Sequence, residues 1–289
     1  MNNIITNICM PSARHIIAAM AIAIMPLSAM AQKTLTILHT NDTHSCVLPQ
    51  SKNLADTIQA GKGGFTRRVA LLKEERQKDP DLLYFDSGDF SQGSAYYSMF
   101  KGDVEVGLLN KMKVDASTIG NHEFDFGMDN LAHLADIANF PILCSNYDFT
   151  GTVLDGKIKT YAIYKRKGIK IGVFALDPKL EGLVSASNCV GIKFQNPIEK
   201  ANEMAEFLKN KKKCDVVILI SHLGWGDGEY EDPNVIAHSR NIDLVLGGHS
   251  HTYFQTLKYA KNLDGKDIPV DQNGKNAVFV GKMKLTISK

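Results

Sequence analysis

Apolar runs of strand length alternate with segments of helical period along most of the chain, and this alternation restricts its fold most. The runs predicted as strands are Leu35–Leu38, Leu82–Phe85, Ala116–Ile119, Pro141–Cys144, Tyr161–Tyr164, Ile169–Ala175, Val216–Ile220 and Leu244–Leu246. Strands that alternate with helices are typical of α/β folds with a largely parallel sheet. The two runs between Tyr161 and Ala175 differ, because Lys167-Gly168 between them predicts the turn of an antiparallel hairpin.

Segments between these runs carry apolar residues at helical spacing. The predicted faces are Phe65/Val69/Leu72, Val104/Leu108/Met112, Met128/Leu131/Ala135 and Ile198/Ala201/Ala205/Leu208. The last helix has clear end signals: Asn196 can cap it, Pro197 suits its first turn, and the lysines at 211–213 lie where the helix dipole favours cations. We therefore interpret that lysine run as a solvated helix end.

Charge and apolar content exclude several functions. With 33 basic and 31 acidic side chains, the formal net charge of +2 gives no overall field that would hold nucleic acid or an anionic membrane. A hydrophobic content of 44% is too high for a disordered chain. Nine histidines against one tryptophan is the compositional feature that favours a chemical site.

The first 31 residues are typical of a secretory signal peptide. Arg14 precedes the apolar run Ile16–Met25, and Ala29-Met30-Ala31 precedes Gln32. The run is too short for a membrane anchor, and Cys9 lies before it, where it cannot serve as a lipid-attachment site. We expect cleavage after Ala31 and a periplasmic or secreted product without a membrane anchor.

Residues 32–289 are enough for one large domain, and no linker or repeat marks a second one. The cysteines in this part have no CxxC spacing, which argues against a zinc ribbon or a thioredoxin-like site. Export would permit disulfides, but a domain of this size does not need them. Buried free thiols are therefore favoured, with the pairing left open, for Cys46, Cys144, Cys189 and Cys214.

Polar side chains directly follow five of the predicted strands. The segments are Asn41-Asp42-Thr43-His44, Asp86-Ser87-Gly88-Asp89, Gly120-Asn121-His122-Glu123, Ser221-His222 and Gly247-Gly248-His249-Ser250-His251. Because sites in open α/β sheets form at the carboxyl ends of strands, we expect these loops to converge. The converged carboxylate, imidazole and amide groups would suit Zn, Mn or Fe.

The number of ligands predicts two metal ions. In an extended segment, side chains two residues apart point the same way, so Asp42 and His44 could hold one ion, and His249 and His251 a shared cluster. The loops offer more ligands than one ion needs. A pair of ions can clamp both the attacking and the leaving oxygen in phosphoryl transfer.

These ordered motifs resemble the calcineurin-like metallophosphoesterases, in their 5'-nucleotidase branch. Gly120–Glu123 and Gly248–His251 resemble superfamily motifs, whereas Ile37–Asp42 and Phe124–Gly127 resemble the nucleotidase branch. The resemblance covers nearly all of the chain after the leader and implies a four-layer α/β/β/α sandwich. Strand counting permits this sandwich but does not distinguish it from a single doubly wound sheet.

The resemblance also implies a role for each ligand. It assigns Asp42, His44 and His251 to the first ion, Asn121, His222 and His249 to the second, and Asp89 as the bridge between them. Asp86 could compete as the bridge, but we interpret it as a supporting or loop-capping residue. His39 is interpreted as packed inside a strand, and Glu123 has no role that we can derive.

His122 and Asp125 are the predicted catalytic pair. In an extended loop, His122 would point away from the ligand side of Asn121 and toward substrate. On a turn or helix start, Asp125 at i+3 would reach His122 and favour its imidazolium form, which can protonate a leaving alkoxide. The family uses the same pair, so the expected reaction is phosphate-ester hydrolysis by metal-activated water with this pair assisting.

Nucleoside 5'-monophosphates are the favoured substrates. In full-length 5'-nucleotidases a second domain stacks the nucleobase, and this chain ends at Lys289 near the end of the resemblance. We therefore expect the catalytic domain alone, without the C-terminal nucleotide-binding domain, which a separate chain could supply. The alternatives are a phosphodiesterase of cyclic nucleotides or nucleotide sugars and a non-catalytic binding module; the intact ligand set and catalytic pair argue against the module.

Overall fold

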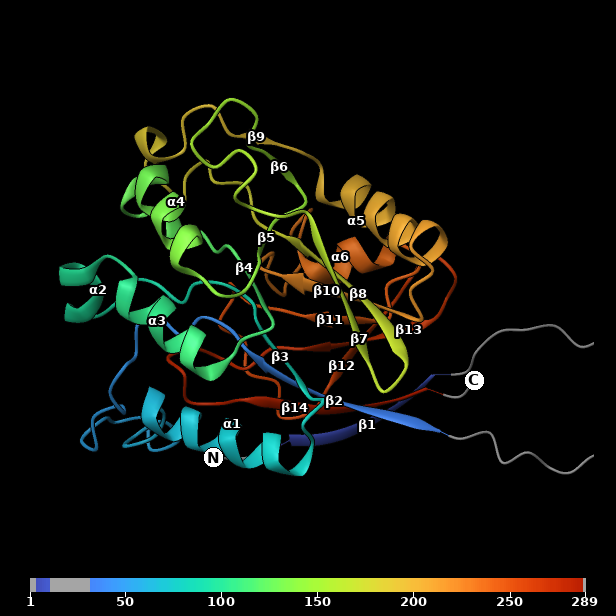
Figure 1. Cartoon of the computed structure of the whole chain (residues 1–289), viewed down its shortest axis with the longest axis horizontal. Coiled ribbons are helices and arrows are strands. Elements are labelled where there is room, and N and C mark those ends of the chain that lie inside the picture. The colour runs from blue at the N-terminus through green and yellow to red at the C-terminus, as the bar shows by residue number, and fades with distance from the viewer. Residues whose placement is uncertain (1–3, 11–31, 288–289) are drawn as a thin grey trace, which may run out of the picture.

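Two mixed six-stranded sheets pack face to face in the computed structural model, which describes residues 4–10 and 32–287 (Figure 1). The first sheet has the order β1 (Ile4–Met10), β14 (Gly281–Ile287), β2 (Lys33–Thr40), β3 (Leu83–Asp86), β4 (Ala116–Thr118) and β5 (Ile142–Leu143). The second has the order β12 (Lys258–Lys261), β13 (Asp267–Asp271), β11 (Leu244–Leu246), β10 (Val216–Ser221), β8 (Ile169–Leu176) and β7 (Tyr161–Arg166). A short ribbon pairs β6 (Tyr147–Asp148) with β9 (Lys193–Phe194).

Helices cover the outer face of each sheet. The first sheet packs against α1 (Phe65–Lys78), α3 (Asp103–Met112) and α4 (Gly127–Ile137), and the second against α5 (Pro197–Glu206) and α6 (Asp232–Ala237). A short helix, α2 (Ala95–Phe100), precedes α3. The predicted four-layer α/β/β/α sandwich is therefore confirmed, and the single doubly wound sheet is wrong.

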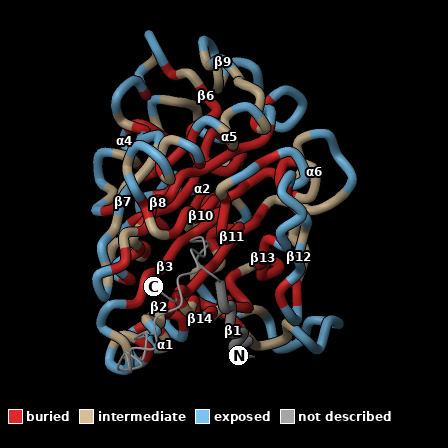
Figure 2. The backbone as a smooth tube through the Cα atoms, turned by 90° about the vertical axis from the view of Figure 1, so that its right-hand side faces the viewer, coloured by how far each residue is buried: buried red, intermediate tan, exposed pale blue. Residues whose placement is uncertain are grey.

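The period of two along each strand explains why the strands read as continuous apolar runs. In β2, Ile37 packs between the two sheets while the adjacent Leu38 packs under the helices. In β10, Ile218 faces the first sheet and Leu219 faces α5 and α6. Because both faces of these strands are covered, neither face carries a row of polar residues, as is typical of buried parallel strands. Figure 2 shows the buried residues concentrated along the strands.

All of the predicted strands form, and the hairpin is confirmed, with Arg166 of β7 opposite Ile169 of β8. Several strands were not predicted. Of these, β13 contains a proline and β12 is largely exposed. In β14, Met283, Leu285 and Ile287 alternate with less buried residues, so the strand lacks a continuous apolar run.

The expected face of one helix is only partly right, because Met112 is buried as expected but the rest of the buried face is shifted. In α3, Val104 and Leu108 are only half-buried, and the buried residues are Glu105, Val106, Leu109 and Met112. The helix is rotated because Val106 and Leu109 fit the core of the first sheet, and Glu105 finds a buried hydroxyl partner in Ser45.

Part of the predicted leader lies outside the described residues. This holds for the apolar run Ile16–Met25 and the cleavage position after Ala31. Residues Ile4–Met10 form strand β1, which pairs in parallel with β14. On its other side β14 pairs with β2 from Gly281 to Ile287, so this second pairing does not depend on β1. In the described part of the chain, no helix combines the length and apolarity that a membrane crossing requires.

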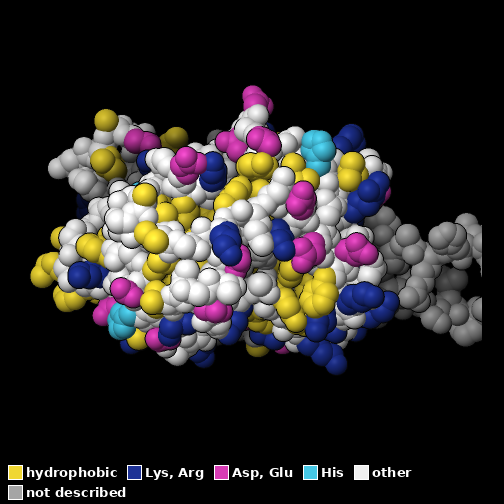
Figure 3. All heavy atoms as spheres, turned by 90° about the horizontal axis from the view of Figure 1, so that it is seen from above, with side chains coloured by type: hydrophobic (Ala, Val, Ile, Leu, Met, Phe, Trp, Pro, Cys, Tyr) yellow, Lys and Arg dark blue, Asp and Glu magenta, His cyan; other side chains and the backbone are white. Residues whose placement is uncertain are grey.

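The cysteines at 46, 144, 189 and 214 are free thiols. Cys144 and Cys214 are buried as expected, whereas Cys46 and Cys189 are half-buried. On the face shown in Figure 3, basic, acidic and apolar side chains are interspersed.

The predicted cap of α5 is confirmed and gives a stability test. Asn196 Oδ1 accepts hydrogen bonds from the N–H groups of Ile198 and Glu199, at 2.8 and 3.3 Å. Replacing Asn196 with Ala should lower the free energy of unfolding by about 1 kcal/mol, because the first turn loses its acceptor. Urea unfolding followed by circular dichroism measures this, with Asn196→Asp as the control that keeps the acceptor. Equal losses in both variants would contradict the capping role.

Candidate metal centre

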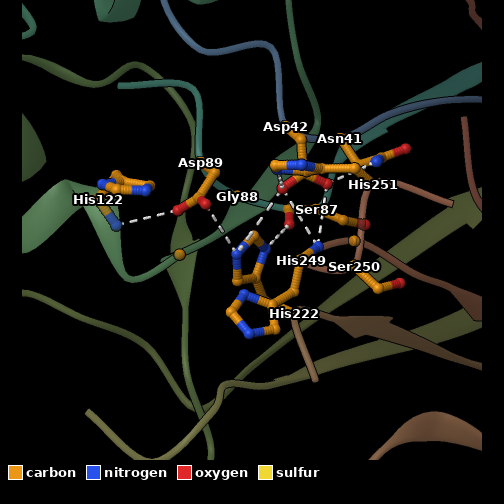
Figure 4. A network of polar contacts seen from close by, with 12 residues as sticks. Asn41, Asp42, Ser87, Gly88, Asp89, His122, His222, His249, Ser250 and His251 are labelled. Carbon is orange, nitrogen blue, oxygen red and sulfur yellow. Dashed lines mark hydrogen bonds and ion pairs between the residues drawn. The ribbon is translucent and has the colours of Figure 1, made fainter. Parts of the chain in front are cut away.

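The loops after β2, β3, β4, β10 and β11 converge at one edge of the two sheets, as predicted. They form two groups whose candidate ligand atoms lie within 4.8 Å of one another in each group: Asp42, His44 and His251, and Asp89, His222 and His249. In both groups the carboxylate comes from the first sheet, and the second sheet supplies histidines. Figure 4 shows Asp42 and His251 of the first group close to the second group, Asp89, His222 and His249.

Asp42 contacts residues of both groups. Its Oδ1 lies 3.5 Å from His251 Nε2 and 4.0 Å from His222 Nε2, and its carboxylate accepts a hydrogen bond from the His249 backbone N–H. Asp89 Oδ2 lies 3.2 Å from His222 Nε2. Both carboxylates thus lie within 4.0 Å of His222 Nε2, and the assignment of Asp89 as the bridge stays a prediction.

The backbone is left-handed at several predicted ligands, including those in the segments Asp42–His44 and His249–His251, which were expected to be extended. Among the predicted ligands, positive φ angles occur at Asp42 (48°), His44 (42°), Asp89 (50°), His249 (70°) and His251 (56°). This conformation costs a residue with a Cβ about 1–2 kcal/mol. It persists where the surrounding structure enforces it, and such residues cluster at functional sites.

Two glycines let the loops after β3 and β4 touch. Gly88 has a φ of 79°, and a Cβ there would lie 2.7 Å from the Ile119 carbonyl oxygen. A Cβ on Gly120 would overlap the Asp89 carboxylate. Any side chain at either position would therefore push Asp89 away from the residues that follow Gly120.

Two buried polar atoms at the site lack hydrogen-bond partners. Asn121 Oδ1 and His222 Nε2 are both buried without one. His222 donates from Nδ1 to the Ser87 carbonyl oxygen at 2.6 Å, which leaves its Nε2 directed at Asp89. A histidine that is held in this way through one ring nitrogen is oriented to bind a metal with the other.

Two of the candidate histidine ligands are neutral, as metal binding requires. Burial lowers the pKa of His249 to about 4 and also lowers the pKa of His44, so both imidazoles are neutral at pH 7 and can donate a lone pair. Burial disfavours the Asp89 carboxylate, but His222 outweighs this and lowers the pKa of Asp89 below its usual value. His222 differs, because burial opposes its charge but the Asp89 and Asp42 carboxylates outweigh burial and raise its pKa, so this imidazole must lose a proton when a metal binds. The imidazoles, the carboxylates and the orphaned amide oxygen together fit Zn, Mn or Fe.

His122 and Asp125 lie beside the first group. His122 begins a short 3₁₀ helix, η1 (His122–Phe124), so the expected extended loop is wrong. The expected contact forms because one helical turn brings residue i+3 close: His122 Nδ1 lies 3.0 Å from Asp125 Oδ2. The His122 ring lies 5.5 Å from that of His44. The hydrogen bond that His122 donates to the Asp125 carboxylate outweighs burial and raises the pKa of His122.

Asp86, which we interpreted as supporting, and His39, which we interpreted as packed, both occupy such positions. Asp86 accepts a hydrogen bond from Thr40 Oγ1 at 2.6 Å and one from the Gly88 N–H at 3.2 Å, which caps the loop after β3. His39 is fully buried, with Nε2 2.9 Å from Ser87 Oγ.

Three further residues that sequence reasoning missed hold the loop of His122. Tyr97 Oη donates to the His122 carbonyl at 3.1 Å, and Asn188 Nδ2 donates to the carbonyl oxygens of Phe124 and Asp125 at 3.0 Å. Glu123 is the third, and its side chain accepts from backbone N–H groups. The partners of these side chains are backbone atoms, which leave no pattern in a sequence.

Comparisons with known proteins agree with this fold and site. A sequence profile of the calcineurin-like phosphoesterases matches residues 35–253. The chain is 33% identical over 273 residues to a snake venom 5'-nucleotidase of Crotalus adamanteus, covering 87% of this chain and 45% of that protein. It therefore spans about half the length of such curated relatives.

Solved structures of a 5'-nucleotidase precursor and a calcineurin-like phosphoesterase also align with this chain. A 5'-nucleotidase precursor from Thermus thermophilus aligns with a TM-score of 0.76 and 28% identity, over 87% of this chain and 51% of that one. The calcineurin-like phosphoesterase YfkN from Bacillus subtilis aligns with a TM-score of 0.73 and 26% identity, over 89% and 86% of the two chains.

An α/β/β/α sandwich with histidine and aspartate loops at the carboxyl ends of its strands defines a class of metal-dependent phosphoesterases. The chain belongs to the calcineurin-like phosphoesterase family.

The contact between His122 and Asp125 predicts a change in pH dependence. Replacing Asp125 with Asn should lower the pKa of His122, because the carboxylate that raises it is gone. The His122 imidazole then loses its proton at a lower pH. The alkaline limb of the pH profile of kcat should therefore move to lower pH. Hydrolysis of p-nitrophenyl phosphate with Mn(II), measured across pH, tests this. Asp129→Asn, at an exposed acid in the first turn of α4, should leave the profile in place. An unchanged alkaline limb in Asp125→Asn would contradict the role of the pair.

Proposed function

We propose that this protein is an exported phosphoesterase with two divalent metal ions, and that its substrates are nucleoside 5'-monophosphates. The observation that carries the proposal is the pair of ligand groups at one edge of the sandwich, with His122 and Asp125 beside them. Each group combines one carboxylate with two imidazoles, and the groups lie close enough for Asp42 to contact both.

Seven side chains would hold the ions. Asp42, His44 and His251 would form one site, Asn121, His222 and His249 the other, and Asp89 would be shared. When bound, such ions supply Lewis acidity, which acidifies water and offsets the charge that builds up on phosphoryl oxygens. Ser87 keeps His222 in the orientation that this requires, through its carbonyl oxygen.

His122 acts as the general acid for the leaving group. Asp125 holds the proton at His122 Nδ1, which leaves Nε2 as the atom that can give a proton to the departing alkoxide. Tyr97 and Asn188 fix the backbone of this loop, so the imidazole is positioned before substrate arrives. A positioned acid of this kind typically contributes a factor of about 10² to 10⁴ in rate.

The relatives support the substrate class. Several proteins that match the chain over more than four-fifths of its length are 5'-nucleotidases, from snake venom and from Homo sapiens. Export is supported by Arg14, the apolar run Ile16–Met25 and the Ala29-Met30-Ala31 segment, and by the venom source of these relatives.

Phosphate release from AMP tests the proposed reaction. The chain from Gln32 onward, loaded with Mn(II) or Zn(II), should release phosphate, and a chelator should abolish the release. Release from bis(p-nitrophenyl) phosphate without release from AMP would contradict the monophosphate assignment and favour a diesterase.

Replacing His122 with Ala separates catalysis from metal binding. The expected result is a fall in kcat of about 10² to 10⁴ at unchanged metal content, because His122 is an acid and not a ligand. His133→Ala is a matched control, since His133 also pairs with a carboxylate, Asp103 at 2.8 Å, but lies exposed on α4. Metal analysis of both variants should match wild type, and a parallel loss of metal and activity in His122→Ala would contradict the assignment.

A further inference from the structure

Glu123 is a fully buried acid whose side chain joins two of the loops that carry predicted ligands. Its Oε2 accepts the backbone N–H of Asp89 at 3.0 Å and that of Gly120 at 2.6 Å. Its Oε1 accepts the backbone N–H of Ser91 at 2.9 Å. Asp89 and Ser91 belong to the loop after β3, and Gly120 to the loop after β4. One carboxyl group therefore satisfies three backbone donors from both loops.

The side chain of Asp89, in the loop after β3, also contacts the backbone of the loop after β4. Asp89 Oδ1 accepts the backbone N–H of His122 at 2.9 Å, and this leaves Asp89 Oδ2 facing His222 at 3.2 Å. Each loop thus sends one carboxyl group to the backbone of the other. Gly120 allows the close approach, since a Cβ there would overlap Asp89. The His122 N–H thus occupies Asp89 Oδ1 and leaves Oδ2 available to a metal.

The Asp89 backbone depends on this support. Its φ of 50° is unfavourable for a residue with a side chain, and its N–H is buried and needs an acceptor. Without Glu123, three neighbouring N–H groups would lose their partner together. The loop after β3 could then satisfy them only by moving or by admitting water, and either change would move the Asp89 carboxylate relative to Asn121 and His222.

We propose that Glu123 is a positioning residue of the metal centre, which fixes the separation of the Asp89 loop from the Asn121–His122 loop and thereby the spacing of the two ions. The inference rests on the proposed two-metal function and goes beyond it, because Glu123 is not itself a predicted ligand. Residues that support metal ligands typically change metal affinity by about 10-fold to 100-fold when they are replaced.

Two substitutions and a matched control test the inference. Glu123→Ala removes all three acceptors, whereas Glu123→Gln keeps the volume and one oxygen but turns an amide N–H₂ toward a backbone donor. Asp177→Asn is the control, because Asp177 is equally buried and accepts hydrogen bonds from the Thr118 hydroxyl at 2.9 and 3.0 Å. Mn(II) is titrated into each metal-free protein by calorimetry, and the loaded proteins are examined by electron paramagnetic resonance. Circular dichroism of the metal-free proteins establishes that each variant folds.

Wild type and Asp177→Asn should bind two Mn(II) ions and show the signal of an exchange-coupled pair. The second ion should bind about 100-fold more weakly to Glu123→Ala and about 10-fold more weakly to Glu123→Gln. Both variants should also show the hyperfine pattern of isolated Mn(II), because the ions are no longer held at a fixed separation.

If a folded Glu123→Ala binds the second Mn(II) ion with wild-type affinity and shows the wild-type exchange coupling, the inference is wrong. If the alanine variant does not fold, the same result in Glu123→Gln overturns the inference. An equal loss in Asp177→Asn also overturns it, because any buried carboxyl group would then have the same effect. A wild-type chain that binds only one ion contradicts the two-metal function itself, and this outcome is distinct because it appears before any substitution is made.

Discussion

The apolar contact between the two sheets is the interaction on which the site depends. Asp42 and Asp89 come from the first sheet and His222, His249 and His251 from the second, so each group of candidate ligands closes only when the sheets meet. The layer between the sheets is buried and largely aliphatic, and Ile37 and Ile218 both belong to it. A close-packed layer of this kind resists small displacements, and it therefore sets the distances across the metal centre.

Within that frame, the loops are held in conformations that the chain would not adopt alone. Left-handed backbone at five predicted ligands costs several kcal/mol in sum, if each costs about 1–2 kcal/mol. Hydrogen bonds that backbone N–H groups donate to side-chain carboxyl groups offset this cost, notably those accepted by Asp86, Asp89 and Glu123. The same contacts fix the ligand atoms before any ion is bound, which is the condition for precise coordination.

The sequence was most informative where local rules decide the outcome. The buried strands followed from apolar runs bounded by polar residues, the α5 cap from Asn196-Pro197, and the His122–Asp125 contact from i+3 spacing. It failed where distant segments decide. The positive φ of Asp89 depends on the loop after β4, and the partners of Glu123 are backbone groups brought together by the fold. The separation into two sheets required the family resemblance, because both arrangements use the same strands.

The central claim is that two ions bind between these loops, one in each group. Anomalous diffraction from a crystal of the chain loaded with Mn(II) tests it most directly. Two peaks are expected, one enclosed by Asp42, His44 and His251 and one by Asp89, Asn121, His222 and His249. A single peak, or peaks away from these residues, would contradict it.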